Sequence, residues 1–255
     1  MTKKQTKAWS VPPQWVGVNG GISTTSSGAL AWGRGSVPEI AKNRLDWAEK
    51  ADFIIGFAVS LEQVHGTRVV EVTAANGGAG FLDPATRISA TDGLFTRDPH
   101  VVLLTSHADC APIFLYHPQA RSIGLIHAGW RGTLAGIAAS AVATQCRAHD
   151  LRPCDLLVAI GPTIGTVNYP VGEDVAAQFV AKFGPNVVTR YAGCPHLDVY
   201  AALIVDLLRA GVTDARNCPR PPDTFANPIW SSYRRDGERA GGMLAYFNLT
   251  SSMSE

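Results

Sequence analysis

Residues 107–131 read H-A-D-C-A-P-I-F-L-Y-H-P-Q-A-R-S-I-G-L-I-H-A-G-W-R. Residues 111–116 and 122–127 are two short apolar runs, and the H-P-Q-A tetrapeptide between them has the composition of a turn. This pattern predicts a β-hairpin. The hairpin is the centre from which the rest of the chain can be interpreted.

The hairpin brings a cysteine and a histidine toward each other. If the turn is centred between Pro118 and Gln119, Cys110 and His127 face each other, with Cβ atoms about 4.5–5.5 Å apart. A thiolate and an imidazole at that separation can share one metal ion, or can act as a nucleophile and its general base. A register slip of one residue would send the two side chains to opposite faces.

Composition limits the class of protein. The chain has 255 residues, 46% of them hydrophobic, which is enough for a substantial core. Its 22 basic and 21 acidic residues give a net charge of +1, so no long-range attraction to nucleic acid or anionic membrane is expected. No apolar run approaches the ~18 residues of a membrane span, and the amino terminus lacks the apolar core of a signal peptide. Five widely spaced cysteines indicate reduced thiols. We therefore expect a cytoplasmic protein that binds neither nucleic acid nor membrane.

Other segments predict a mixture of helices and strands. Ser36-Val-Pro-Glu39 matches a capping box at the start of a helix, and Gly129-Trp-Arg-Gly132 opens another. Further helices are expected near residues 175–183 and 199–208. Buried strands are expected at 53–59 and 155–160, and other strands at 68–72, 90–96, 101–105 and 243–249. Residues 20–28 are expected to form a flexible loop. The elements do not alternate strictly, which predicts one α+β domain over residues 1–255, with a short flexible tail at about residues 1–10.

Two arginines stand out along this pattern. Arg44 occupies the apolar stripe of the first helix, where it either snorkels to the rim of the core or serves as a partly buried cation for an anion such as phosphate. Arg131 lies at the amino-terminal end of its helix, where backbone N–H groups favour anions. The alternative for Arg131 is a solvated side chain in the first turn.

His65 follows one predicted strand and precedes the next, a position where sites are often built. His65, Cys110 and His127 could together form a catalytic zinc site whose fourth position is left to water. Zinc would lower the pKa of that water toward ~7 and supply hydroxide at neutral pH. The residues alone do not establish that the three meet.

A series of short motifs runs through the chain: Gln63-Val-His65-Gly, Thr91-Asp92-Gly-Leu-Phe-Thr96, Ala108-Asp109-Cys110-Ala-Pro112, His127-Ala-Gly-Trp-Arg-Gly132, Gly161-Pro-Thr-Ile-Gly165 and Ser232-Tyr-Arg-Arg-Asp-Gly237. Together they resemble the YfiH-like family, formerly called multicopper polyphenol oxidase or laccase-domain proteins. Its members are described as purine nucleoside phosphorylases with adenosine deaminase activity. The resemblance implies an α/β/β/α layered fold with mixed sheets, and it implies that His65, Cys110 and His127 bind zinc.

The resemblance also implies substrates. A zinc-dependent phosphorylase of this kind would convert adenosine, inosine or methylthioadenosine and phosphate into free base and ribose 1-phosphate, with adenosine deamination as a side activity. Arg44 and Arg131 then become candidates to hold phosphate. The sequence departs from the family at His107, where a threonine-like residue is usual, at Thr163, where serine or cysteine is commoner, and at Gly242, where the family's G-R-M-A element has arginine. These departures concern substrate preference more than the chemistry.

Three other functions compete with this one. A metal-free hydrolase or amidase would use Cys110 as nucleophile and His127 as base. Copper-dependent oxidation of phenols is less favoured than zinc chemistry, because seven histidines are too few for the additional copper cluster of a laccase. A structural zinc fold or interaction module would instead require a fourth protein ligand, for which His107 and Asp109 are the candidates.

Overall fold

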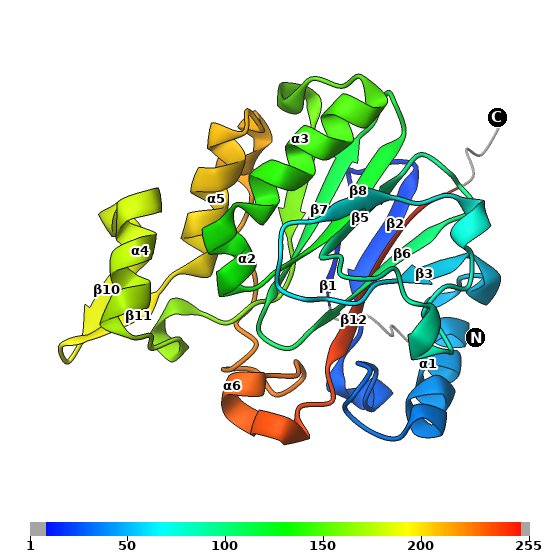
Figure 1. Ribbon diagram of the computed structural model, residues 1–255, viewed down its shortest axis with the longest axis horizontal. Helices are drawn as coiled ribbons and strands as arrows, with labels where there is room; N and C mark the ends of the chain where they lie inside the picture. The colour runs from blue at the N-terminus through cyan, green and yellow to red at the C-terminus, as the bar shows by residue number, and fades with distance from the viewer. Residues whose placement is uncertain (1–8, 251–255) are drawn as a thin grey trace.

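The computed structural model describes residues 9–250 and consists of two stacked mixed sheets with helices outside them (Figure 1). The first sheet has the strand order β1 (Trp9–Ser10), β2 (Val18–Ile22), β12 (Met243–Leu249), β6 (Val102–His107) and β3 (Ala58–Ser60). The second sheet has the order β4 (Val69–Glu71), β5 (Gly93–Thr96), β8 (Ser122–Ala128), β7 (Ala111–His117) and β9 (Leu157–Ile160).

Helix α1 (Val37–Ala51) covers the outer face of the first sheet, and α3 (Ile137–His149) and α5 (Val199–Arg209), with the short α2 (Trp130–Ala135), cover that of the second. Helices α4 (Glu173–Phe183) and α6 (Tyr233–Asp236) lie outside these layers (Figure 1). A small extension, formed by α4 with the two-stranded sheet of β10 (Val188–Tyr191) and β11 (Cys194–Leu197), projects from one side (Figure 1).

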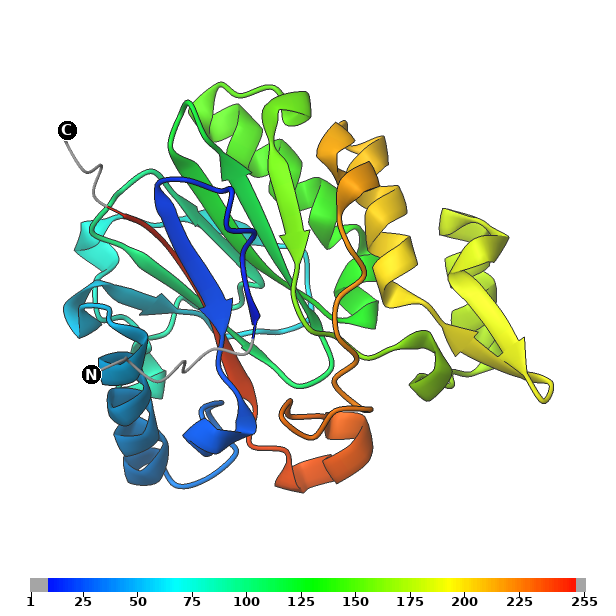
Figure 2. The same ribbon diagram turned by 180° about the vertical axis from the view of Figure 1, so that it is seen from behind.

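Three apolar layers hold this arrangement together. The first sheet packs against α1, where Trp47 contacts the cluster that contains Leu104. The second sheet packs against α3 and α5 through side chains such as Ile113. Between the sheets, the rings of Phe114 and Phe247 have centroids 5.3 Å apart. Burial of these apolar surfaces is the main stabilising term, and the resulting α/β/β/α order confirms the predicted fold class (Figure 2).

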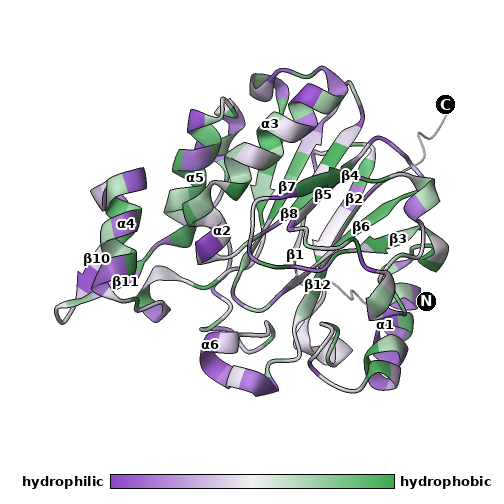
Figure 3. Cartoon of the chain, in the orientation of Figure 1, coloured by the Kyte–Doolittle hydropathy of each residue, from purple (hydrophilic) through white to green (hydrophobic). Residues whose placement is uncertain are grey.

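Figure 3 shows hydrophobic residues concentrated on the strands and more hydrophilic residues on the outer helices, α1 and α6 among them. This distribution follows from burial of the sheets on both faces. Within residues 9–250, the helices are too short or too polar to cross a membrane.

The central hairpin forms as predicted, but its predicted register is wrong by two residues. His127 pairs with Pro112 rather than with Cys110. The loop covers residues 118–121, with Arg121 in a left-handed backbone (φ 49°), so the turn is centred between Gln119 and Ala120 and not between Pro118 and Gln119. Side chains alternate with a period of two, so this shift leaves Cys110 and His127 on the same face.

Residues 20–22 correct the prediction of a flexible loop at 20–28, because they belong to β2, which is an interior strand between β1 and β12. A Cβ at Gly20 would lie 2.7 Å from Cδ2 of Phe247 and 2.9 Å from Cγ1 of Val11. Glycine is therefore used here for close packing rather than for flexibility.

Other boundaries also differ from the predictions. Trp9 and Ser10 pair with β2 and do not belong to a flexible tail, whereas residues 1–8, with the lysines among them, lie outside the described residues. The strand expected at 53–59 is shorter, since residues 55–57 form a 3-10 helix before β3. The helix that opens at residue 130 is divided at Gly136, whose φ of 95° ends α2 and begins α3.

We expect Gly20→Ala to lower the free energy of unfolding by about 1–3 kcal/mol, because the added methyl group would overlap the Phe247 ring and the Val11 side chain. Gly56→Ala is the matched control, since its Cβ would meet no atom within 4 Å. Urea unfolding followed by tryptophan fluorescence measures both losses. Equal losses in the two variants would contradict the packing argument.

Candidate metal centre

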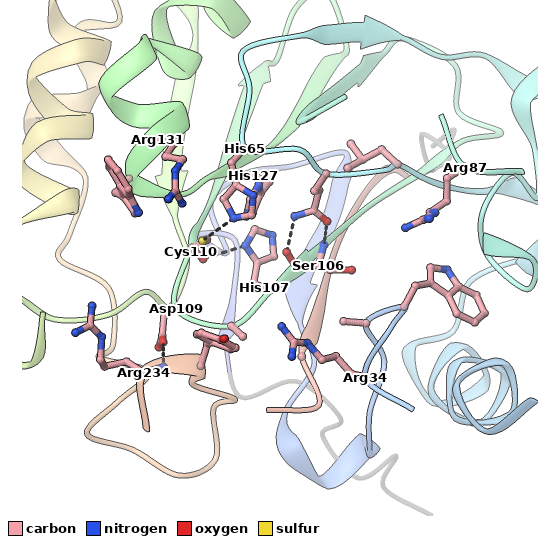
Figure 4. A pocket seen from close by; sticks show the side chains of 18 of the residues that line it. Arg34, His65, Arg87, Ser106, His107, Asp109, Cys110, His127, Arg131 and Arg234 are labelled. Atoms are coloured by element: carbon pink, nitrogen blue, oxygen red, sulfur yellow. Dashed lines mark hydrogen bonds between the residues drawn. The ribbon is translucent and has the colours of Figure 1, made fainter. Parts of the chain in front are cut away.

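His65, Cys110 and His127 come from three separate segments and meet at one point (Figure 4). Their ligand atoms all lie within 4.8 Å of one another, and Sγ of Cys110 is 3.9 Å from Nε2 of His65. His127 is on β8, Cys110 lies in the bend before β7, and His65 lies in the loop between β3 and β4. The structure therefore brings together the three residues that the sequence nominated as ligands.

The backbone on either side of the site is unusual. His65 has φ 60° and Asp109 has φ 85°, both in the left-handed region that non-glycine residues seldom occupy. Such conformations persist where surrounding contacts fix them. The carbonyl of Asp109 accepts hydrogen bonds from Oγ1 of Thr163 at 2.6 Å and from the N–H of Ile164 at 3.0 Å, which anchor the Cys110 bend to the loop after β9.

Asp92 connects two of the three ligands. Its fully buried carboxylate accepts the backbone N–H groups of His65 at 2.9 Å, Gly66 at 2.7 Å and Val64 at 3.3 Å. The same carboxylate lies 3.0 Å from Nδ1 of His127. Burial raises the pKa of Asp92, but the hydrogen bonds with His127 and the backbone outweigh it and lower the pKa.

Asp92 is a positioning residue that the sequence reasoning missed. The Thr91-Asp92-Gly motif contributes to the family resemblance but indicates no separate role for Asp92. Its position directly before the buried strand β5 could have indicated this role. A carboxylate is buried in a core only where it is fully hydrogen-bonded.

The charged forms of Cys110 and His127 stabilise each other. Burial raises the pKa of the Cys110 thiol, but the charge of His127 and hydrogen bonds with His127 and His65 outweigh it and lower the pKa to about 6. Burial lowers the pKa of His127, but the charge of Cys110 and the hydrogen bond with Asp92 raise it to about 9. The lowered pKa favours the thiolate form of Cys110, and the thiolate is the form that binds metals.

The donor set fits zinc. One thiolate and two imidazoles within reach of one point are ligands that Zn²⁺ accepts. Nδ1 of His127 is held by Asp92, which leaves Nε2 for a metal in the carboxylate–histidine–metal arrangement common in such centres.

The two residues named as a fourth ligand have other partners. His107 has Nδ1 3.0 Å from the Cys110 carbonyl and Nε2 2.7 Å from Oγ1 of Thr105. The Asp109 carboxylate accepts Oγ1 of Thr224 at 2.6 Å and the N–H of Arg234 at 2.7 Å. Among residues 9–250 the metal-binding group thus consists of three side chains, the number typical of a catalytic zinc site with an open position.

The three ligands form one wall of a pocket of about 570 Å³, a volume suited to a small-molecule substrate. Charged and aromatic side chains dominate the remaining walls: Arg34, Arg87, Arg131, Arg234, Trp32, Trp130, Tyr169 and Tyr233. The carboxylate in this lining, that of Asp109, is already hydrogen-bonded. The pocket is therefore cationic, with rings available for stacking.

The arginines fall into two groups. Arg131 and Arg234 line the pocket, with their guanidinium carbons 4.3 Å from the Trp130 ring and 5.1 Å from the Tyr169 ring. Arg44 is instead fully buried outside the pocket lining, with hydrogen bonds to the carbonyl oxygens of residues 30, 80 and 81. Arg44 connects two loops within the core, and its side chain does not reach the rim of the core.

The family departures have local explanations. The Thr163 hydroxyl donates to the Asp109 carbonyl, so it supports the Cys110 bend. Gly242 has φ 72°, and a Cβ there would lie 2.4 Å from Cβ of Ala31. With this backbone, position 242 does not admit a side chain such as arginine.

A layered α/β/β/α fold with this His-Cys-His group defines a laccase-like class of protein. The family model described as "Multi-copper polyphenol oxidoreductase laccase" matches residues 17–250, and the chain belongs to this family, as its motifs predicted.

Several similar proteins are named as purine nucleoside phosphorylases. The chain is 36% identical over 214 residues to the purine nucleoside phosphorylase YlmD of Geobacillus stearothermophilus, covering 82% of this chain and 78% of the relative. It is 37% identical over 213 residues to a purine nucleoside phosphorylase of Deinococcus radiodurans, covering 82% and 77%. The crystal structure of YlmD from Geobacillus stearothermophilus superposes with a TM-score of 0.88 at 31% identity, covering 96% of this chain and 98% of that one. The Bacillus licheniformis protein YfiH gives 0.86 at 26% identity, covering 93% and 94%.

Proposed function

We propose that this protein is a zinc-dependent purine nucleoside phosphorylase that converts adenosine, inosine or methylthioadenosine and phosphate into free base and ribose 1-phosphate. The observation that carries the proposal is one pocket that combines the His65, Cys110 and His127 group with the pocket-lining arginines. The names of the relatives point to the same reaction.

The reaction forms a bond between a phosphate oxygen and C1′ of the ribose and breaks the bond between C1′ and N9. The electron pair of the broken bond leaves with the purine, which takes up a proton. Phosphate carries most of the charge in this step, so a cationic wall lowers its cost of desolvation and fixes its direction of approach.

Arg131 and Arg234 are the residues to which we assign the binding of phosphate. Neither guanidinium forms an ion pair with a carboxylate of residues 9–250, and each rests on an aromatic ring that limits its motion. Burial and the charge of Cys110 raise the pKa of Tyr169, which keeps its hydroxyl protonated as a neutral donor beside both arginines. Arg44, engaged with carbonyl oxygens in the core, is left out of this phosphate position.

Zinc held by the three ligands would act as a Lewis acid on an oxygen at its open position. The chain's own part is to hold the ligands in place through Asp92. Trp130 and Tyr169 line the pocket beside these ligands.

We expect Arg131→Gln to raise the KM for phosphate about 10–100-fold with little change in zinc content, because it removes a charge-assisted hydrogen-bond donor but no metal ligand. Arg147→Gln, an exposed arginine on α3, removes the same charge elsewhere and serves as the control. Steady-state kinetics at varied phosphate measures the effect. An unchanged KM for phosphate would remove Arg131 from the phosphate position.

The proposed function is tested with purified protein, adenosine and inosine, in the presence and absence of phosphate, together with a metal analysis. The expected result is about one zinc per chain and release of free base only when phosphate is present. Base release at the same rate without phosphate would indicate a hydrolase. The absence of base release from zinc-loaded protein would refute the proposal.

The three-ligand group also supports adenosine deamination as a side activity. With His107 and Asp109 engaged elsewhere, the open position can take a water, and activated water is the reactant of zinc deaminases. Ammonia release from adenosine in phosphate-free buffer tests this activity. If metal depletion abolishes both deamination and phosphorolysis in the same sample, the two reactions share one site.

Zinc is favoured over copper in this proposal because a phenol oxidase of the laccase type needs further copper sites, and residues 9–250 contain one group with metal-binding geometry. We also place the protein in the cytoplasm. The five cysteines support this placement, because all of them are free thiols.

A further inference from the structure

The wall of the pocket opposite the metal-binding group carries a second pair of arginines. Figure 4 shows Arg34 and Arg87 on one side of the pocket, with Cys110, His65 and Arg131 on the other. Arg34 comes from the loop before α1, and Arg87 comes from the segment between β4 and β5. The pocket therefore has a cationic group at each end.

The charge of this second pair is poorly neutralised. Nη1 of Arg34 contacts Glu238 at 2.6 Å, but the Glu238 side chain is 81% exposed, so solvent screens the pair. Arg87 donates from Nε to the carbonyl of Pro84 at 2.7 Å, and its two terminal nitrogens have no hydrogen-bond partner within residues 9–250. Both guanidinium groups can therefore bind an anion.

Arg44 adds a third positive charge behind this wall. It is fully buried and lies 4.3 Å from the ring of Trp32, which lines the pocket. Its partners are carbonyl oxygens, and its Nη2 has no hydrogen-bond partner in the described structure. Burial, and then the charge of Arg87, lower the pKa of Arg44 to about 9. Positive charges that repel one another in a partly desolvated place are stabilised by an anion.

From this arrangement we propose that Arg34 and Arg87 form a second phosphoryl-binding subsite, separate from the phosphate position at Arg131 and Arg234. Its ligand is the 5′-phosphate of a purine nucleoside monophosphate. The purine part of this assignment and the separate phosphate position at Arg131 rest on the proposed function, whereas the subsite itself is argued from the charges and contacts of Arg34 and Arg87.

Two considerations favour a nucleotide. A neutral nucleoside and one phosphate need a single anion position, which the Arg131 end already supplies. The rings of Trp32 and Tyr233 lie beside the second arginine pair, where a nucleoside attached to the bound phosphoryl group could stack. Free inorganic phosphate carries the same anionic oxygens as the phosphoryl group of a nucleotide, and binding measurements distinguish these two occupants.

The test is isothermal titration of zinc-loaded protein with adenosine, adenosine 5′-monophosphate and inorganic phosphate, each in phosphate-free buffer. We expect the nucleotide to bind at least about 10-fold more tightly than adenosine. Arg87→Gln and the double variant with Arg34→Gln should abolish this preference, whereas Arg87→Lys should retain part of it. Arg131→Gln and the surface control Arg147→Gln should leave it intact.

Equal affinity for nucleotide and nucleoside, or a preference that survives in the double variant, would overturn the proposal. If the wild-type protein binds adenosine and the nucleotide equally, and the double variant loses one of two binding positions for inorganic phosphate, free phosphate is the occupant and the nucleotide assignment is wrong. Because these measurements require no turnover, they remain decisive if phosphorolysis is absent. Thermal unfolding and zinc content of each variant confirm that the comparison is made on folded, loaded protein.

Discussion

Cys110→Ala is expected to abolish zinc binding and to lower kcat/KM for phosphorolysis by about three orders of magnitude or more, while the protein remains folded. Cys110 supplies the one thiolate among three ligands, and two imidazoles alone bind zinc far more weakly. Metal analysis after dialysis and the phosphate-dependent release of base measure the two effects. Cys154→Ala, which alters an exposed cysteine away from the pocket, is the matched control.

The same measurements on a second variant, His65→Ala, separate the metal enzyme from a Cys-His hydrolase. Both lose activity in Cys110→Ala, but the hydrolase does not need His65. His65→Ala should therefore lose zinc and activity together if the metal is required. Activity that survives in this variant without metal would favour the hydrolase and contradict the phosphorylase proposal.

Asp92→Asn is expected to weaken zinc affinity about 10–100-fold and to lower the free energy of unfolding by about 2–4 kcal/mol. The amide can no longer accept the backbone N–H groups of Val64, His65 and Gly66 while also holding Nδ1 of His127. Competition with a chelator measures the affinity, and urea unfolding of the metal-free protein measures the stability.

Asp98→Asn is the control for this substitution. The Asp98 carboxylate also accepts two backbone N–H groups, those of Ala74 at 2.7 Å and His100 at 2.8 Å, but it lies away from the metal-binding group. It should lose stability without losing zinc affinity. Equal zinc affinity in the Asp92 and Asp98 variants would show that Asp92 does not position the ligands.

The hairpin and its two ligands could be predicted because both depend on local pattern. The error of two residues in the register came from the turn, since the left-handed backbone of Arg121 is not evident from its residue type. The prediction that Cys110 and His127 lie on the same face was unaffected, because a register shift of two residues leaves each side chain on its original face.

Other features depended on contacts between distant segments. Gly20 reads locally as a flexible position, and only the nearby Phe247 ring shows that it belongs to a packed strand. Arg44 was correctly placed on the apolar stripe of α1, but the carbonyl oxygens that surround it come from two loops whose meeting no local pattern indicates. Asp92 was missed for the same reason, because its partners are nearly 30 positions before it and 35 positions after it.

The hydrogen bonds of Asp92 also bear on how the protein acquires its metal. One carboxylate fixes both the loop at His65 and the ring of His127, so the chain itself makes the contacts that position these two ligands. Loading then resembles the capture of an ion by a rigid chelator, and little of the binding free energy is lost to ordering the chain. The scaffold can therefore fold first and be metallated afterwards, unlike small zinc domains whose folding waits for the ion.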